Sequence, residues 1–153
     1  MYFMGGRGAA SASYSGYGSE YKSIHSYSNI KFVFNTAQTN TKAPLETRTK
    51  NRVYVTLNYQ SGIPQYISYY DKEGNKFKVI DAHKKRHYNL VTNGTKKRYL
   101  DVVHRHNGYN HEELGSGNMT TQERKLRLLV LREYRKNVRT KARKYISDRK
   151  RDD

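Results

Sequence analysis

The sequence predicts a single α+β domain, made of an antiparallel β-meander, a histidine-rich loop and one long basic C-terminal helix. Three observations support this fold class. The chain has 153 residues, the size of one domain with tails. Apolar and polar residues alternate in short segments between residues 30 and 81, which is the period of half-buried strands. No Gly or Pro occurs from Thr120 to Ser147, as expected of a long helix.

The first 29 residues are expected to form a flexible arm. The segment from Gly5 to Asn29 is rich in Gly, Ser, Ala and Tyr and shows neither a strand period nor a helix period. Its tyrosines at positions 14, 17, 21 and 27 are interpreted as solvated linker residues, with stacking on nucleic-acid bases as the alternative. The folded domain is predicted to span residues 30–148, and residues 149–153 a tail.

Four strands are predicted within the meander, residues 30–81. The first begins at Ile30, and residues 36–50 after it are polar enough for a long loop. Residues 53–59 alternate most clearly. Residues 65–70 and 76–80 form two further β-rich runs, and between them Gly74 can take the positive φ that a short hairpin loop requires.

The alternation fades in residues 82–119, which are expected to form a basic, histidine-rich loop with a short strand at 99–103. The helix is then predicted for residues 120–148. Thr120 and Glu123 have the spacing of a capping box. Apolar residues recur every three or four positions in one stripe, consisting of Leu128, Leu131, Tyr134, Val138, Ala142 and Tyr145.

Net charge is the strongest functional signal in the sequence. Thirty Lys and Arg against 13 Asp and Glu give +17, a balance that attracts phosphate backbones and predicts RNA or DNA as the partner. A basic surface that serves only solubility is the alternative. The contacts with nucleic acid are expected from Lys84, Lys85, Arg86, Lys96, Lys97, Arg98, Arg105, Arg135, Arg139 and Arg143.

Several other classes of protein are disfavoured. With no cysteine, the chain forms no disulfide and no thiolate metal site. No run approaches the roughly 20 apolar residues that span a bilayer, so no membrane partner is expected. The carboxylates are few and scattered, which argues against a glycosidase-like pair, and no nucleophile elbow is present.

Five of the six histidines lie close together in the sequence, at His83, His87, His104, His106 and His111. Because histidine titrates near neutral pH, two such residues can supply the proton acceptor and the proton donor for RNA cleavage by transesterification. His104 and His106 are the preferred catalytic candidates, with His83 or His87 as the second member of the pair.

The same histidines have two other interpretations. His104, His106 and His111 are a candidate set of ligands for a divalent ion such as Zn, Mg or Mn, together with a nearby carboxylate. As hydrogen-bonding surface residues they would instead belong to a phosphate-contacting patch without catalysis. The residues alone leave acid–base chemistry, metal chemistry and simple binding open.

Several segments resemble small phage and prophage proteins that have an N-terminal Gly-Gly-Arg-Gly segment, a Tyr-rich β-meander and a His-rich loop. The matching segments are Met4–Ala9, Asn29–Val33, Ala43–Thr47, Arg52–Thr56, Ile67–Asp71 and His104–Tyr109. The Tyr-Tyr-Asp hairpin and the His-x-His loop are also similar to C-terminal nuclease-like domains of bacterial polymorphic toxins. This chain differs by an enlarged basic insertion, Lys84–Asp101, and by a longer basic helix.

The resemblance implies a phage-linked origin near head-morphogenesis genes, a location in the bacterial host cytoplasm or in the phage particle, and a nuclease-like loop centred on His104 and His106. Two functions are therefore expected. The first is a phage-associated basic protein that binds nucleic acid and has a candidate His-based, RNase-like nuclease site. The alternative is a non-catalytic virion or head-morphogenesis component that binds DNA or an acidic surface of phage structural proteins.

Overall fold

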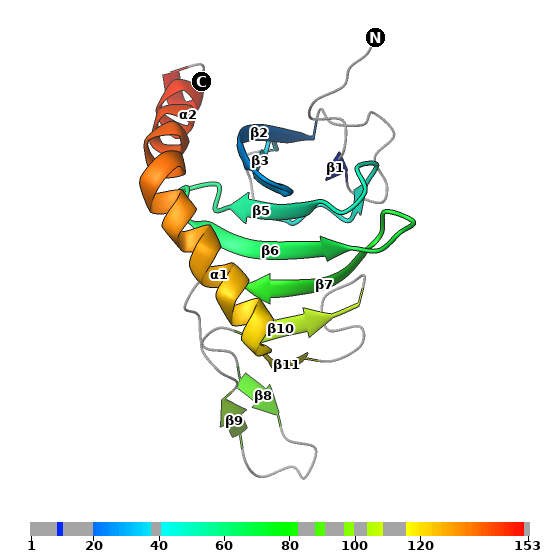
Figure 1. Cartoon of the computed structure of the whole chain (residues 1–153). Coiled ribbons are helices and arrows are strands. Elements are labelled where there is room, and N and C mark those ends of the chain that lie inside the picture. Colours follow the sequence, from blue (N-terminus) through cyan, green and yellow to red (C-terminus); the bar gives the residue numbers. More distant parts are fainter. Residues whose placement is uncertain are drawn as a thin grey trace.

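A computed structural model describes residues 9–10, 20–37, 41–82, 88–90, 97–99, 104–108 and 116–151. It contains a seven-stranded sheet crossed diagonally by a C-terminal helix, so the predicted α+β class is confirmed (Figure 1). The strands follow one another across the sheet in the order β11 (Ser116–Asn118), β10 (His104–Asn107), β7 (Lys76–Asp81), β6 (Pro64–Tyr70), β5 (Val53–Leu57), β3 (Ile30–Asn35) and β2 (Tyr21–Tyr27). Two short ladders accompany it, formed by β1 (Ala9–Ala10) with β4 (Glu46–Thr47) and by β8 (Tyr88–Leu90) with β9 (Lys97–Tyr99).

The pairing of the strands extends the predicted meander. Strands β5, β6, β7, β10 and β11 pair antiparallel in turn, and β2 pairs antiparallel with β3. Strand β3 is parallel to β5. The connection between them therefore passes over one face of the sheet and returns to the edge at which β3 began. Residues 41–50 of this connection lie on the face away from the helix, where the Tyr21 hydroxyl donates to the Lys42 carbonyl at 2.8 Å and the Tyr70 hydroxyl donates to the Pro44 carbonyl at 2.5 Å.

Two predicted boundaries differ from the structure. Strand β2 lies inside the range assigned to a flexible arm, and Tyr21, expected to be a solvated tyrosine, is buried. Strands β10 and β11 lie inside the predicted histidine-rich loop. Neither segment shows an apolar period, because β2 contains a bulge and β10 carries Arg105 and His106, whose side chains form polar contacts. The strand expected at residues 99–103 overlaps β9 only at Tyr99. Residues 100–103 lie outside the described part of the chain.

The C-terminal helix is continuous and consists of α1 (Thr121–Glu133), the π-helical turn η1 (Tyr134–Val138) and α2 (Arg139–Arg151). The capping box is confirmed, because the Thr120 hydroxyl accepts from the Glu123 backbone N–H and the Glu123 carboxylate accepts from the Thr120 N–H. The helix passes the predicted end at residue 148. Its last turn is held there by Arg149, which donates to the Tyr59 carbonyl at 2.5 Å.

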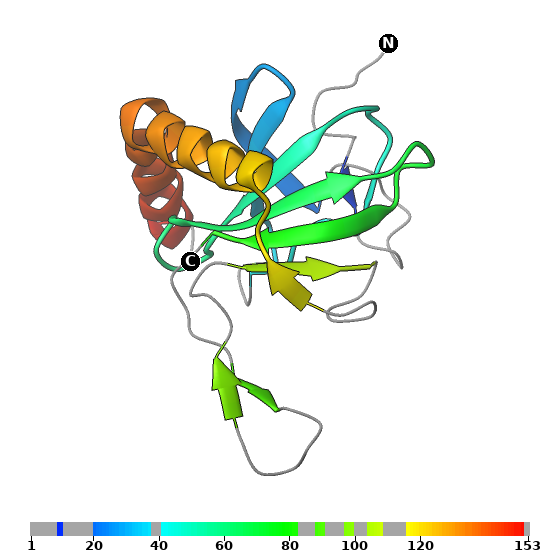
Figure 2. The same cartoon turned by 60° about the horizontal axis from the view of Figure 1, so that its bottom comes forward.

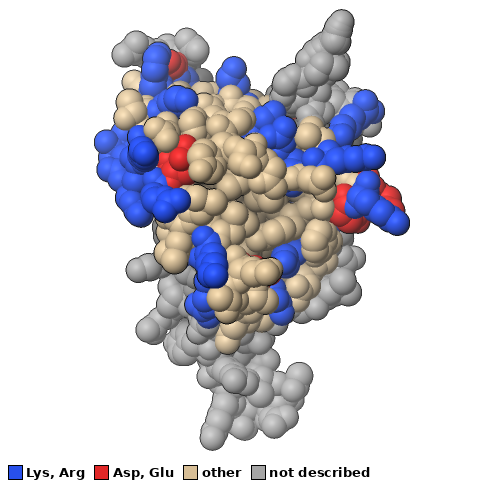
Figure 3. Space-filling view, in the orientation of Figure 1, with Lys and Arg blue, Asp and Glu red and all other residues tan. Residues whose placement is uncertain are grey.

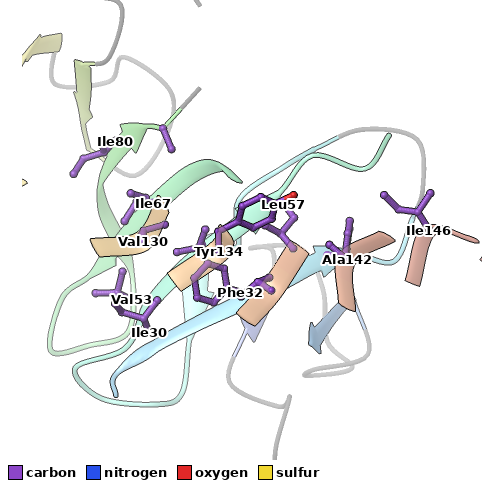
Figure 4. Close-up of a cluster of buried hydrophobic side chains, with 14 of the residues drawn as sticks. Ile30, Phe32, Val53, Leu57, Ile67, Ile80, Val130, Tyr134, Ala142 and Ile146 are labelled. Atoms are coloured by element: carbon purple, nitrogen blue, oxygen red, sulfur yellow. The ribbon is translucent and has the colours of Figure 1, made fainter. Parts of the chain in front are cut away.

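The main core lies between the sheet and this helix, which covers one face only (Figures 1 and 2). Figure 4 shows apolar side chains from both layers meeting there. On the helix they are Val130, Tyr134, Val138, Ala142 and Ile146, spaced four residues apart. The predicted stripe was therefore wrong at its start, where Leu128 is 62% exposed.

The π-helical turn explains this spacing. Four residues of an α-helix turn through about 400°, so a stripe with four-residue spacing drifts by about 40° at each step. A π-turn has more residues per turn and rotates less per residue. Turn η1, in the middle of the stripe, therefore keeps the later apolar residues facing the sheet. Apolar spacing of three or four residues in the sequence does not reveal such a turn.

The hairpin between β6 and β7 confirms the predicted role of Gly74, which has φ +88°. A Cβ at this position would lie 2.1 Å from the Thr47 carbonyl oxygen. Gly74→Ala is therefore expected to destabilise the protein by about 2 kcal/mol or more in urea unfolding, since a left-handed conformation alone costs about 1–2 kcal/mol. Gly117→Ala is the control, because its Cβ would make only an ordinary contact with Arg105, at 3.6 Å. Equal effects of the two changes would contradict this assignment.

Candidate nucleic-acid interface

The outer side of the C-terminal helix is strongly basic. Residues 121–151 contain thirteen Lys and Arg against three acidic residues. The exposed cations are Arg124, Lys125, Arg132, Arg135, Lys136, Lys141, Arg143, Lys144 and Lys150, which together are named the basic helix face here. Figure 3 shows Lys and Arg side chains gathered over the helix. This surface has the charge and length to meet a phosphate backbone.

The acid at the start of the helix does not reduce this positive surface. Glu123 is buried, with its carboxylate 2.6 Å from the Lys78 ammonium and 3.4 Å from the Arg105 guanidinium. Burial opposes its ionisation, but the Lys78 hydrogen bond, the Thr120 backbone N–H and the charges of Lys78 and Arg105 outweigh it and lower the pKa of Glu123. Its negative charge is therefore directed at two cations of the sheet.

The second acid also points inward. Glu133 is buried and accepts hydrogen bonds from Asn137 Nδ2 and from His25 Nε2, both at 2.8 Å. The Asn137 hydrogen bond, aided by His25 and Lys136, lowers the pKa of Glu133 against the effect of burial. The third acid, Asp148, lies nearer the surface, 2.8 Å from the Lys144 ammonium. Two of the three carboxylates of this helix thus anchor it to the sheet.

The predicted contacts divide into three groups. Arg135, Arg139 and Arg143 follow one another at four-residue spacing on the helix, Arg135 and Arg143 exposed and Arg139 half-buried. Arg105 contacts the buried Glu123 instead of lying among the exposed cations. The remaining predictions fall on side chains outside the described ones, those of Lys84, Lys85, Arg86, Lys96, Lys97 and Arg98, although the backbone of Lys97 and Arg98 is part of β9.

His106 occupies a buried position in the sheet, with 3% of its surface exposed. Its Nε2 lies 3.1 Å from Asp81 Oδ2 on the neighbouring strand. The side chain of Arg105 reaches the helix, so alternation along β10 places His106 on the opposite face of the sheet. The pair His106–Asp81 therefore ties β10 to β7 and does not face the basic helix face.

The other candidate histidines are not brought together by the part of the chain that the structure describes. His104 pairs with Asn118 through the backbone, but its side chain is outside the described set. His83, His87 and His111 also lie outside it, so their catalytic and metal-binding roles stay predictions. Among the residues described here, no group of three or more His, Asp or Glu side chains is placed to hold a metal ion.

One histidine that the sequence reasoning missed lies beside the helix. His25, on the edge strand β2, contacts Glu133 through Nε2 and the Lys141 ammonium through Nδ1, at 2.8 and 2.9 Å. The register of β2 shifts between Ser23 and His25, which breaks the alternation that would have revealed a strand. No pattern in the sequence joins His25 to a helix more than 100 residues later.

These features define an α+β protein with a seven-stranded mixed sheet and a basic helix across one face. A scan against protein-family models and searches of curated proteins and of solved structures find no match to this chain. No helix in the described ranges has both the length and the apolar character needed to cross a bilayer.

Proposed function

We propose that this protein binds nucleic acid by placing the basic helix face against the phosphate backbone. One observation carries the proposal. The helix has thirteen Lys and Arg, whereas two of its three carboxylates are buried and oriented toward cationic or imidazole partners in the sheet. The charges that remain on the exposed side of the helix are almost all positive. The phage-linked setting implied by the resemblance to phage and prophage proteins is part of the proposal.

The geometry favours contacts with phosphates over the reading of bases. A helix of this length extends about 45 Å, longer than one turn of duplex DNA, about 34 Å. Most of the cations in its central part are arginines, whose planar guanidinium groups bind phosphate oxygens in pairs. Contacts of this kind fix position and supply affinity but carry no sequence information. Binding should therefore be strong at low salt and should depend little on sequence.

The test is a triple variant of the basic helix face, Arg132→Gln, Arg135→Gln and Arg143→Gln, measured by fluorescence anisotropy with labelled 30-mer RNA and DNA over a range of salt concentrations. Each lost phosphate contact lowers the slope of log Kd against log salt by about 0.7–0.9, so the triple variant should lower it by about 2–3. Affinity at low salt should fall correspondingly on every sequence tested.

The matched control removes the same charge elsewhere. Lys42, Lys50 and Lys72 are exposed and belong to loops outside the helix. Changing these three to Gln should leave the salt slope within about one unit of wild type. If the two triple variants lose affinity equally, binding follows net charge alone and the helix has no special role. If neither RNA nor DNA binds to the wild-type protein, the proposed function is wrong.

A further inference from the structure

We infer that His25, Glu133 and Lys141 form an acid–base site that cleaves single-stranded RNA. The inference rests on the proposed binding of nucleic acid, because the site lies beside the basic helix face and would act on a strand held there. It differs from the nuclease site expected from the sequence, which involves other histidines in the segment 82–119.

Two irregularities of regular structure meet at this point. In strand β2 the register shifts between Ser23 and His25, so the bulge directs the His25 side chain toward the helix. In the helix, Glu133 immediately precedes the π-turn η1, which contains Asn137. Bulges in strands and π-turns in helices are both over-represented at functional sites. Here they place residues that are 108 positions apart within hydrogen-bonding distance.

The hydrogen bonds fix the state of the imidazole. Lys141 is a donor only, so Nδ1 of His25 accepts from its ammonium at 2.9 Å. Nε2 then carries the proton and donates it to Glu133, whose oxygen also accepts from Asn137. A buried carboxylate that orients a histidine in this way stabilises the imidazolium formed when the other nitrogen takes a proton. Glu133 is thus a positioning residue and His25 a proton acceptor.

The site opens to solvent on the side where a substrate would lie. The side chain of His25 is 15% exposed and that of Glu133 is 9% exposed, whereas Lys141 is exposed. Tyr27, two residues along the same strand, therefore lies on the same side as His25 and is 43% exposed. An exposed aromatic ring is typical of surfaces that stack an unpaired base. These neighbours favour a single strand over a duplex.

His25 and Lys141 can together supply every proton transfer that the cleavage needs. A phosphate oxygen draws the Lys141 ammonium away from His25, and Nδ1 then takes the proton of the ribose 2′-hydroxyl. The 2′-oxygen bonds to phosphorus as the bond from phosphorus to the 5′-oxygen breaks, and Lys141 donates a proton to that leaving oxygen. The products are a 2′,3′-cyclic phosphate and a 5′-hydroxyl. The proton on His25 returns to the Lys141 amine along their hydrogen bond.

The central experiment uses His25→Gln in the full chain. Glutamine can still donate to Glu133 and accept from Lys141, but it cannot exchange protons near neutral pH. Cleavage of a labelled, unstructured RNA should fall about a hundredfold or more, since a positioned acid–base group contributes about 10²–10⁴. Added imidazole should restore part of the activity in His25→Ala. Lys141→Gln should also slow cleavage, whereas Lys50→Gln, an equal loss of charge in a loop outside the basic helix face, should not.

Glu133→Gln tests the positioning role separately. Its pH–rate profile should move to lower pH, because an amide stabilises the imidazolium less than a carboxylate does. Kd for 2′-O-methyl RNA, which lacks the nucleophile, is measured for every variant and should stay within about twofold of wild type for His25→Gln. Wild-type protein that binds this RNA but cleaves none of the unmodified strand overturns the site and leaves the proposed binding intact. Absence of binding overturns both.

Two further results would count against the site. Full activity in His25→Gln would show that His25 is no proton acceptor. Activity lost in His104→Ala but kept in His25→Gln would assign the chemistry to the histidine loop predicted from the sequence. A cyclic phosphate product that depends on His25 would support the mechanism described here.

Discussion

Replacing Glu123 with alanine is expected to destabilise the protein by about 3–5 kcal/mol, since removing one member of a buried ion pair leaves its partners uncompensated. Glu123 is 3% exposed and serves two structures at once. It closes the capping box of the helix with Thr120, and it neutralises Lys78 and Arg105 in the sheet. Its loss would leave two cations unpaired at the junction of the two layers. Chemical unfolding in urea measures the effect.

The Glu123 effect should depend on pH in a defined direction. The pKa of Glu123 is lowered below its ordinary value of 4.5, so the folded state favours the ionised carboxylate. This stability is present above pH 4.5 and is lost as the pH falls through the lower pKa of the folded state. The difference in unfolding free energy between wild type and Glu123→Ala should therefore become smaller in acid. Glu73→Ala is the control, because Glu73 is exposed and its contact with Lys72 is long, at 4.0 Å. If the difference in unfolding free energy between wild type and Glu123→Ala grows in acid, the assigned ionisation of Glu123 is wrong.

Replacing Phe32 with alanine should have an effect of similar size, about 3–5 kcal/mol, because the side chain is fully buried in the core between sheet and helix. Phe32 lies in β3, next to the edge strand β2, and its ring centroid is 5.9 Å from that of His25. The substitution removes apolar contacts and leaves a cavity. Thermal and urea unfolding monitored by circular dichroism measure the loss.

Phe77→Ala provides the comparison for Phe32, because Phe77 also lies in a strand of the same sheet but is 44% exposed. Phe77→Ala should lower the free energy of unfolding by about 1 kcal/mol or less. Comparable losses from the two changes would mean that the buried cluster does not hold the layers together. A small loss from Phe32→Ala alone would mean that the helix can move to fill the space.

The sequence predicted the elements that follow one regular period. Val53 to Leu57 and Ile67 lie in strands because their apolar side chains alternate, and Gly74 takes a positive φ where the hairpin needs it. The helix start at Thr120 was predictable because the capping box is local, involving residues only three positions apart. These parts depend on neighbouring residues, which a single sequence displays directly.

The remaining parts depend on contacts between distant residues. Strand β10 has no apolar alternation, since Arg105 faces Glu123 and His106 faces Asp81, so its sequence resembles a polar loop. Leu128 is exposed because it lies about 200° around the helix from the buried Val130, and only the packing on the sheet decides which of the two faces inward. The candidate site at His25 needs both a bulge in β2 and a residue more than 100 positions away. The sequence instead predicted a site among the five histidines that lie close together between residues 82 and 119.

The widened turn at Tyr134–Val138 has a consequence for how the helix presents charge to a partner. It changes the rotation of α2 about the helix axis, so that apolar residues after the turn stay buried on the sheet and the exposed Lys and Arg after it stay on the side away from the sheet. In a strictly α-helical segment, an apolar stripe with four-residue spacing would drift around the helix axis, and the polar side opposite it would drift as well. A polyanion lying along the present helix can instead meet both halves without being wrapped around it.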